Sequence, residues 1–417
     1  MHLQTPRPPI AIMLDRHAED ASFLWLLRDA AVASPKYTLR DLAELDGRLE
    51  AHLAGLRLAG DSGWQVARLA LALGEPGEAF VAAVLAFASG GDERTGPVLR
   101  AAEDSPANFR AVVAALGWLD DAAFRGIGRE LLHSAGGSRL RLGIAACAVR
   151  RLDPGAALTR ALDADDPGLR ARALRAAGEL QRSDLLPAVR GQLAADDAAC
   201  RFWAAWSSVL LGDCSPAALA ALRSCVDEQA AGCERAARLL ARTLDARAAN
   251  GWLRQLAGQP ALLRLALIGA GATGDPAYIP TLIKYMEVTA LARVSGEAFS
   301  LITGADLALL DLDRDWPEGF ESGPSEDPLD DDVALDVDED LPWPDPQRVA
   351  AWWQANRHAL VPGRRYLCGH EITLRHCDGV LGRGNQRQRQ AAALEQLRLR
   401  PGRPLFEVRA PGFRQRP

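Results

Sequence analysis

The chain has 417 residues, of which 48% are hydrophobic and 24% are charged, and its net charge is -6. This composition is typical of a globular protein and excludes a disordered or collagen-like chain. No apolar run approaches the roughly 18 residues that a membrane span needs, and the odd, scattered set of seven cysteines does not indicate a disulfide framework. The N-terminal residues do not read as a secretory leader, so we expect a cytoplasmic protein without a membrane segment.

The first sixty residues predict a helical hairpin. The pattern favours one helix over about residues 12–32 and a second helix that begins after Thr38. Thr38 is expected to cap this second helix, with Asp41 at its third helical position. We expect Gly60 and the turn Asp61-Ser62-Gly63 to close the second helix. Residues 1–62 are therefore interpreted as an N-terminal helical cap that covers the apolar face of a repeat array.

Residues 158–216 hold two successive units of about 30 residues, each with a short helix, an Asp-Asp break and a longer helix. An aspartate before the longer helix satisfies free backbone N–H groups and suits the positive helix end, as Asp166 and Asp197 would. Proline is tolerated in the first turn of a helix, where its missing N–H costs nothing. Three prolines accordingly mark the start of a short helix: Pro187, Pro216 and Pro280.

This period, break chemistry and proline placement resemble HEAT-like repeats over residues 64–307. The resemblance implies an all-α, right-handed solenoid of helical hairpins, which we place at residues 63–307. The order of further stretches is similar to a bacterial HEAT-like repeat family of comparable length, whose members are often encoded near type VI secretion components. That resemblance implies an accessory or adaptor role, and it rests on residues 23–32, 37–60, 363–369 and 387–397.

Two oppositely charged segments follow the repeats. Residues 308–346 predict an acidic linker or strap, because 15 acids and one arginine lie between Asp311 and Asp345. Residues 347–417 form an Arg-rich C-terminal segment with 14 arginines and four acids, and its final helix is expected at 385–399. We expect the two segments to pair within the molecule or across a dimer rather than to bind nucleic acid. Apolar anchors favour a docked strap: Trp316, Phe320, Leu329, Val333, Leu335, Val337, Leu341 and Trp343.

The longer helices of the repeats carry the residues that we assign to a protein partner, namely Arg170, Arg172, Trp203 and Trp206. Solenoids present such helices as a binding surface. The same residues could grip damaged DNA, as in HEAT-like DNA glycosylases, and that alternative stays open. In a third reading, the tryptophans belong to the core and the arginines to a solvated face.

The sharpest metal candidate is the set Cys368, His370, His376 and Cys377. Structural zinc sites usually space their ligands as C-x2-C or H-x3-H, and this set does not. Neighbouring His376 and Cys377 would also face opposite sides of a strand. We therefore expect no metal and no cofactor. The overall prediction is a non-enzymatic protein-interaction scaffold or adaptor, with a HEAT-like enzyme or nucleic-acid binder as the alternative.

Overall fold

The computed structural model describes residues 10–320, 323 and 336–416, and the predicted anchors Leu329, Val333 and Leu335 lie outside these residues. The described residues form 21 α-helices and one two-stranded sheet, which confirms the predicted all-α solenoid class. They divide into two compact units. Unit 1 contains the described residues up to 33, residues 37–185 and residues 407–416, and unit 2 contains residues 34–36 and 186–406.

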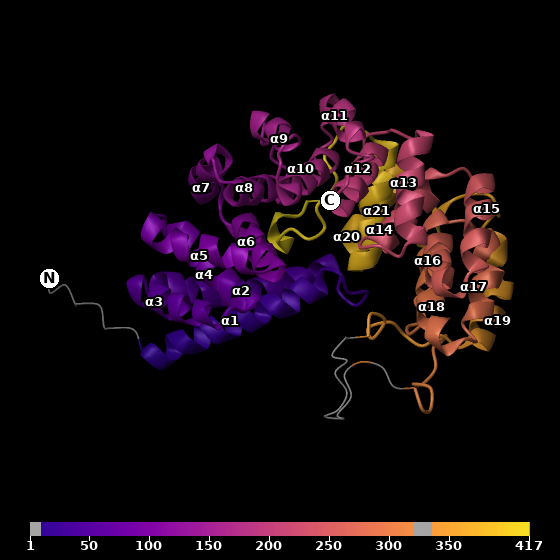
Figure 1. The fold of residues 1–417 in the computed structure, drawn as a ribbon. Coiled ribbons are helices and arrows are strands. Elements are labelled where there is room, and N and C mark those ends of the chain that lie inside the picture. The colour runs from indigo at the N-terminus through magenta and orange to yellow at the C-terminus, as the bar shows by residue number, and fades with distance from the viewer. Residues whose placement is uncertain (1–9, 321–322, 324–335, 417) are drawn as a thin grey trace. The chain divides into compact units, whose positions relative to one another are not determined.

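Unit 1 is a stack of helical pairs that starts with two long helices (Figure 1). Helices α4, α6, α8 and α10 contact one another in turn, and buried side chains of α4, α6 and α8 pack in the core beside those of α1 and α2. The helices of unit 1 are α1 Ala11–Ala31, α2 Leu39–Leu58, α3 Asp61–Ala70, α4 Pro76–Ser89, α5 Asp92–Asp104, α6 Pro106–Trp118, α7 Asp121–His133, α8 Gly137–Val149, α9 Ala156–Ala161 and α10 Pro167–Glu179, with the short 3-10 helix η6 at Gly412–Arg414.

The predicted cap of α2 is confirmed, whereas the predicted closing turn is wrong. The Thr38 side chain accepts from the Asp41 N–H, and the Asp41 carboxylate accepts from the Thr38 N–H, which forms a capping box. Of the predicted turn, Gly60 does lie at the chain reversal, with a φ of 57°, but residues 61–63 form the first turn of α3. A Cβ on Gly63 would lie 2.1 Å from the Leu56 carbonyl oxygen, so only glycine allows this tight junction.

Unit 2 continues with helical pairs of the same kind, in which α14, α16 and α18 contact one another in turn. A β-hairpin and a final helical hairpin, α20 with α21, follow the pairs. The elements of unit 2 are α11 Leu186–Gly191, α12 Ala198–Leu210, α13 Pro216–Asp227, α14 Cys233–Thr243, α15 Ala246–Ala257, α16 Leu263–Thr273, α17 Ile279–Tyr285, α18 Thr289–Thr303, α19 Pro346–Asn356, β1 Tyr366–Leu367, β2 His370–Glu371, α20 Leu374–Arg383 and α21 Gln386–Leu399.

The predicted aspartate caps and first-turn prolines of the repeats are confirmed. Asp166 and Asp197 accept hydrogen bonds from the first-turn N–H groups of α10 and α12. The three prolines lie in the first turns of α11, α13 and α17. Glycine lets the longer helices approach closely, since a Cβ on Gly271 would lie 2.8 Å from Ala298 Cα.

The expected pairing of the acidic segment with the Arg-rich C-terminal segment holds for Asp345, whose carboxylate lies 3.4 Å from Arg348 Nε, but it is wrong for Asp336 and Asp338. Arg293 of α18 binds Asp336, and both Nη atoms of Arg264 in α16 donate to Asp338 at 2.6 and 2.7 Å. The C-terminal segment contributes Arg387, which donates to the Val337 carbonyl at 3.2 Å. Asp336 and Asp338 therefore dock in cis on helices of the repeats.

Three of the predicted anchors surround Arg293, which is only 5% exposed. Its guanidinium carbon lies 4.4 to 5.6 Å from the ring centroids of Trp343, Phe320 and Trp316. The rings also contact one another, at centroid distances of 4.9 to 5.7 Å. Cation–π contact and the Asp336 carboxylate together compensate for burial of this charge.

Candidate functional site

The candidate site is a pocket of unit 2 that is rich in guanidinium groups. Glu395 lies near the end of α21, and Arg398 follows it on the same helix. Asn385 starts this helix with a capping box, which sets where Glu395 falls. Arg365 directly precedes β1, and Arg242 lies in the last turn of α14. Four side chains from three parts of the chain therefore meet at one point.

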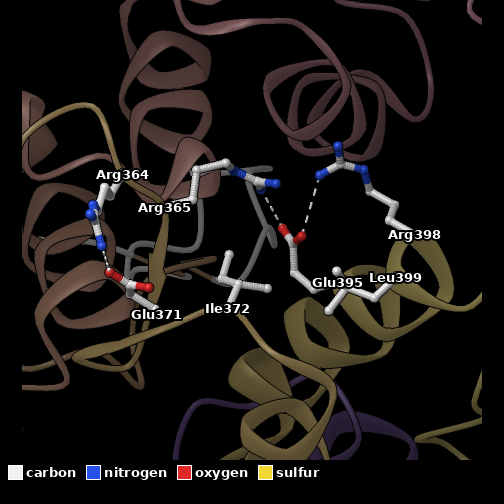
Figure 2. A pocket seen from close by; sticks show the side chains of 7 residues that line it. All are labelled: Arg364, Arg365, Glu371, Ile372, Glu395, Arg398 and Leu399. Carbon is white, nitrogen blue, oxygen red and sulfur yellow. Dashed lines mark hydrogen bonds and ion pairs between the residues drawn. The ribbon is translucent and has the colours of Figure 1, made fainter.

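Glu395 is the centre of this cluster and its side chain is only 3% exposed. An Arg365 Nη donates to one carboxylate oxygen at 2.5 Å, and an Arg398 Nη donates to the other at 3.3 Å. Figure 2 shows these two arginines reaching Glu395 from opposite sides. Beneath them, the Nε of Arg242 lies 3.1 Å from Glu395 Oε1.

The cluster borders a cavity of about 430 Å³. Arg365 and Arg398 each keep about a third of their side chain exposed, at 34%, whereas Arg242 keeps only 3%. A second ion pair, between Arg364 and Glu371, lies at the rim (Figure 2). The cavity is lined by Arg364, Arg365, Glu371, Ile372, Glu395, Arg398 and Leu399.

Positive charge is in excess in this pocket. Burial lowers the pKa of Arg242 to about 10, and the nearby Glu395 carboxylate opposes that shift, so Arg242 stays protonated at neutral pH. Burial likewise lowers the pKa of Arg398, again opposed by Glu395. Three cations thus face a single carboxylate, and a single carboxylate cannot neutralise them all. Such an arrangement suits the binding of a further carboxylate, which an arginine can hold with two parallel hydrogen bonds.

The arrangement favours binding over acid–base chemistry. Guanidinium groups remain protonated in proteins and cannot act as general bases. Glu395 already accepts from two arginines and is nearly inaccessible to solvent. The pocket therefore presents guanidinium hydrogen-bond donors in fixed positions.

The predicted partner-binding arginines lie in unit 1 and make internal contacts. Arg170 donates to the Ala164 carbonyl in the loop before α10. In the next repeat, Arg201 makes the same kind of contact to the Ala195 carbonyl. Arg172 is 10% exposed and contacts Glu179, and burial lowers its pKa to about 10. A role of Arg170 and Arg172 in binding a partner stays a prediction.

The predicted partner-binding tryptophans lie in unit 2 and pack beside each other on α12. The ring centroids of Trp203 and Trp206 are 5.3 Å apart. Arg235 lies over both rings, at 5.2 and 5.9 Å from their centroids. Trp206 is only 3% exposed, whereas Trp203 is half-buried and presents part of its ring to solvent. Their binding role also stays a prediction.

The cysteines and histidines of the metal candidate lie in a β-hairpin and the helix that follows it. His376 and Cys377 belong to α20, and not to a strand as the sequence suggested. The His370 and His376 rings lie 4.9 Å apart, and His376 Nε2 is 2.7 Å from the Leu367 carbonyl oxygen. Burial raises the pKa of Cys377 to about 12. In the described part of the chain, no group of three or more His, Cys, Asp or Glu side chains is placed to hold a metal ion.

Sequence reasoning missed the pocket. Glu395 carried one usable signal, since it is one of only four acids among fourteen arginines in the C-terminal segment. Arg242 carried none, because arginines recur throughout the repeats.

Among the helices that the structure describes, none is long and apolar enough to cross a bilayer.

Comparison with known protein families gives a match over part of the chain. Residues 155–239 match the family model described as HEAT repeats. No curated protein and no solved structure matches the chain. The matched residues coincide with α9 to α14, the helical pairs with the confirmed aspartate and proline punctuation. The match and the stacked helical pairs together indicate HEAT-like repeats in this part of the chain.

Proposed function

We propose that this protein is a non-enzymatic protein-interaction scaffold or adaptor, and that the pocket around Glu395 receives an acidic side chain of its protein partner. The observation that carries the proposal is the meeting of Arg242, Arg365 and Arg398 at one buried carboxylate beside an open cavity. A carboxylate from a partner would neutralise charge that Glu395 leaves unbalanced. Repeat solenoids commonly offer such surfaces to other proteins, which supports the same role.

The finer proposal is that the partner belongs to a bacterial type VI secretion system. Its support is the similarity of residues 23–32, 37–60, 363–369 and 387–397 to the bacterial family described above. The protein would then act as an accessory factor in the cytoplasm and would leave the partner chemically unchanged.

Photo-crosslinking in the native host tests the proposal. A photoreactive amino acid replaces Leu399, which lines the pocket, or Val288, which does not, and both positions are 45% exposed. We expect one reproducible crosslinked protein from position 399 and none from position 288. Arg398→Glu should abolish the crosslink, because it reverses the charge that attracts the partner. The matched control Arg400→Glu, an exposed arginine close by on the chain, should leave it intact.

The outcomes separate the parts of the proposal. Crosslinking that is equal at both positions, or that survives Arg398→Glu, contradicts the pocket as the binding site. A partner that is encoded outside a secretion locus contradicts the type VI assignment but keeps the scaffold. An altered mass of the purified partner after incubation with the protein contradicts the non-enzymatic role.

A further inference from the structure

The last ten described residues of unit 1 form a segment of turns and one 3-10 helix that is held on the N-terminal helices. Residues 407–416 lie beside α2 and α6, as the yellow end of the ribbon shows (Figure 1). Within this segment, only η6 at Gly412–Arg414 has regular structure. The segment is thus bound largely as a peptide would be.

Two charged side chains of unit 1 hold the backbone of this segment. Asp46 is fully buried and accepts from the Gly412 N–H at 2.6 Å. Arg28, 5% exposed, donates to the other Asp46 oxygen at 2.6 Å and to the Arg409 carbonyl at 3.0 Å. Both members of this buried ion pair thus hydrogen-bond the backbone of the same segment, which makes the pair a preorganised recognition element.

The C-terminal end of α6 binds the Arg414 side chain. Its guanidinium donates to the carbonyls of Gly117, Trp118 and Leu119, at the C-terminus of α6. These carbonyls lack partners within the helix and lie at its negative end, so they favour a cation. Phe413 packs its ring edge against Trp118, with centroids 5.5 Å apart, and remains 54% exposed.

The site also selects for glycine. A Cβ on Gly412 would lie 2.8 Å from Ala43 Cα and 3.0 Å from Ala43 N, both in the backbone of α2. Two ion pairs complete the contacts, Arg409 with Asp29 at 3.2 Å and Glu407 with Arg151 at 3.1 Å. The surface thus distinguishes a glycine, an adjacent aromatic residue and an arginine two positions after the glycine.

We propose that this surface of unit 1 is a peptide-recognition site for a partner protein that carries a Gly-aromatic-Arg segment, and that residues 407–416 occupy it in cis as a competitor. Asp29, Asp46 and the α6 carbonyls make the surface complementary to a basic segment. A tethered segment acts at an effective concentration in the millimolar range. The partner segment must therefore displace a competitor that is always present, which makes its binding conditional. This site is separate from the Glu395 pocket and does not depend on it.

Fluorescence anisotropy with a labelled peptide of residues 407–416 tests the proposal on the full chain. The combined substitution Gly412→Val and Arg414→Ala should expel the tail, through the clash with Ala43 and loss of the guanidinium contacts. We expect the peptide to bind this variant about tenfold more tightly than wild type, since a millimolar competitor has that effect on a peptide with a Kd near 100 µM. The control Arg416→Ala, at an exposed position of the same tail, should behave as wild type.

A second tail variant and a substituted peptide extend the test. Arg409→Glu alters only a half-exposed ion pair with Asp29, leaves the core intact, and should also strengthen peptide binding. A peptide that carries Gly412→Val should not bind any variant. Equal binding to wild type and to both tail variants, or no binding to variants with wild-type circular dichroism, overturns the proposal. A wild-type dimer that grows with concentration in mass photometry would make a second copy the occupant and would equally overturn it.

Discussion

Replacing Glu395 by glutamine should destabilise unit 2 much more than any other single charge change in the pocket. The substitution keeps the side-chain size but removes the carboxylate that, among the described residues, pairs with Arg242, Arg365 and Arg398. Arg242 is 3% exposed and cannot recover hydration, and a buried ion pair broken on one side costs about 3–5 kcal/mol. The other two arginines keep a third of their surface in water, so each adds less than about 1 kcal/mol.

The low end of that range, about 3 kcal/mol, is the expected loss, because the glutamine oxygen can still accept one hydrogen bond. This corresponds to a roughly hundredfold change in the opening equilibrium. Native-state hydrogen exchange measures it directly, as faster exchange of the protected amides in α14 and α21. The matched control is Glu371→Gln, which removes a carboxylate at the pocket rim whose side chain is 52% exposed, and exchange there should match wild type.

A second substitution checks the mechanism. Arg242→Met in the Glu395→Gln background should restore part of the lost stability, because an apolar side chain needs no counterion. If Glu395→Gln changes exchange no more than Glu371→Gln does, or if Arg242→Met worsens it, the reasoning about uncompensated charge is refuted.

Three further substitutions test other parts of the fold. Burial disfavours the ionised form of Glu179, but Arg175 and Arg172 outweigh it and hold the pKa of Glu179 below its usual value. The ionised carboxylate therefore stabilises the fold above about pH 4.3, the pKa of a glutamate in the unfolded chain, and this contribution is lost as the pH falls toward the pKa of the folded state. Glu179→Gln should therefore flatten the acid unfolding curve below about pH 4. Arg293→Ala should shift the tryptophan emission and speed limited proteolysis of the acidic segment, and an unchanged digestion rate would argue against its anchoring. Gly304 and Gly319 share a φ of 74°, so an alanine at either position should cost roughly 1 kcal/mol of backbone strain. Only at Gly304 would the new Cβ meet backbone, 2.6 Å from the Cys368 carbonyl oxygen. Gly304→Ala should therefore lower the melting temperature more than Gly319→Ala does. Equal losses in melting temperature would mean that the close approach contributes nothing.

The elements and their punctuation could be predicted from the sequence because their causes are local. The Thr38 capping box, the aspartates before α10 and α12, and the first-turn prolines each act within a few residues of the chain. A period of about 30 residues then predicts the stacking of helical pairs, since a lone pair cannot bury its apolar face.

Which charges meet was decided by the tertiary structure alone. Arg242 and Glu395 are far apart in the chain, and nothing in the sequence distinguishes Arg242 from the solvated arginines of the same helices. Asp338 and Asp336 pair with cations on α16 and α18, and Arg414 donates to carbonyls at the end of α6. Ion pairs act over a few ångströms of space and carry no sequence period, so the helices follow from local chemistry whereas both candidate binding sites follow only from how those helices pack.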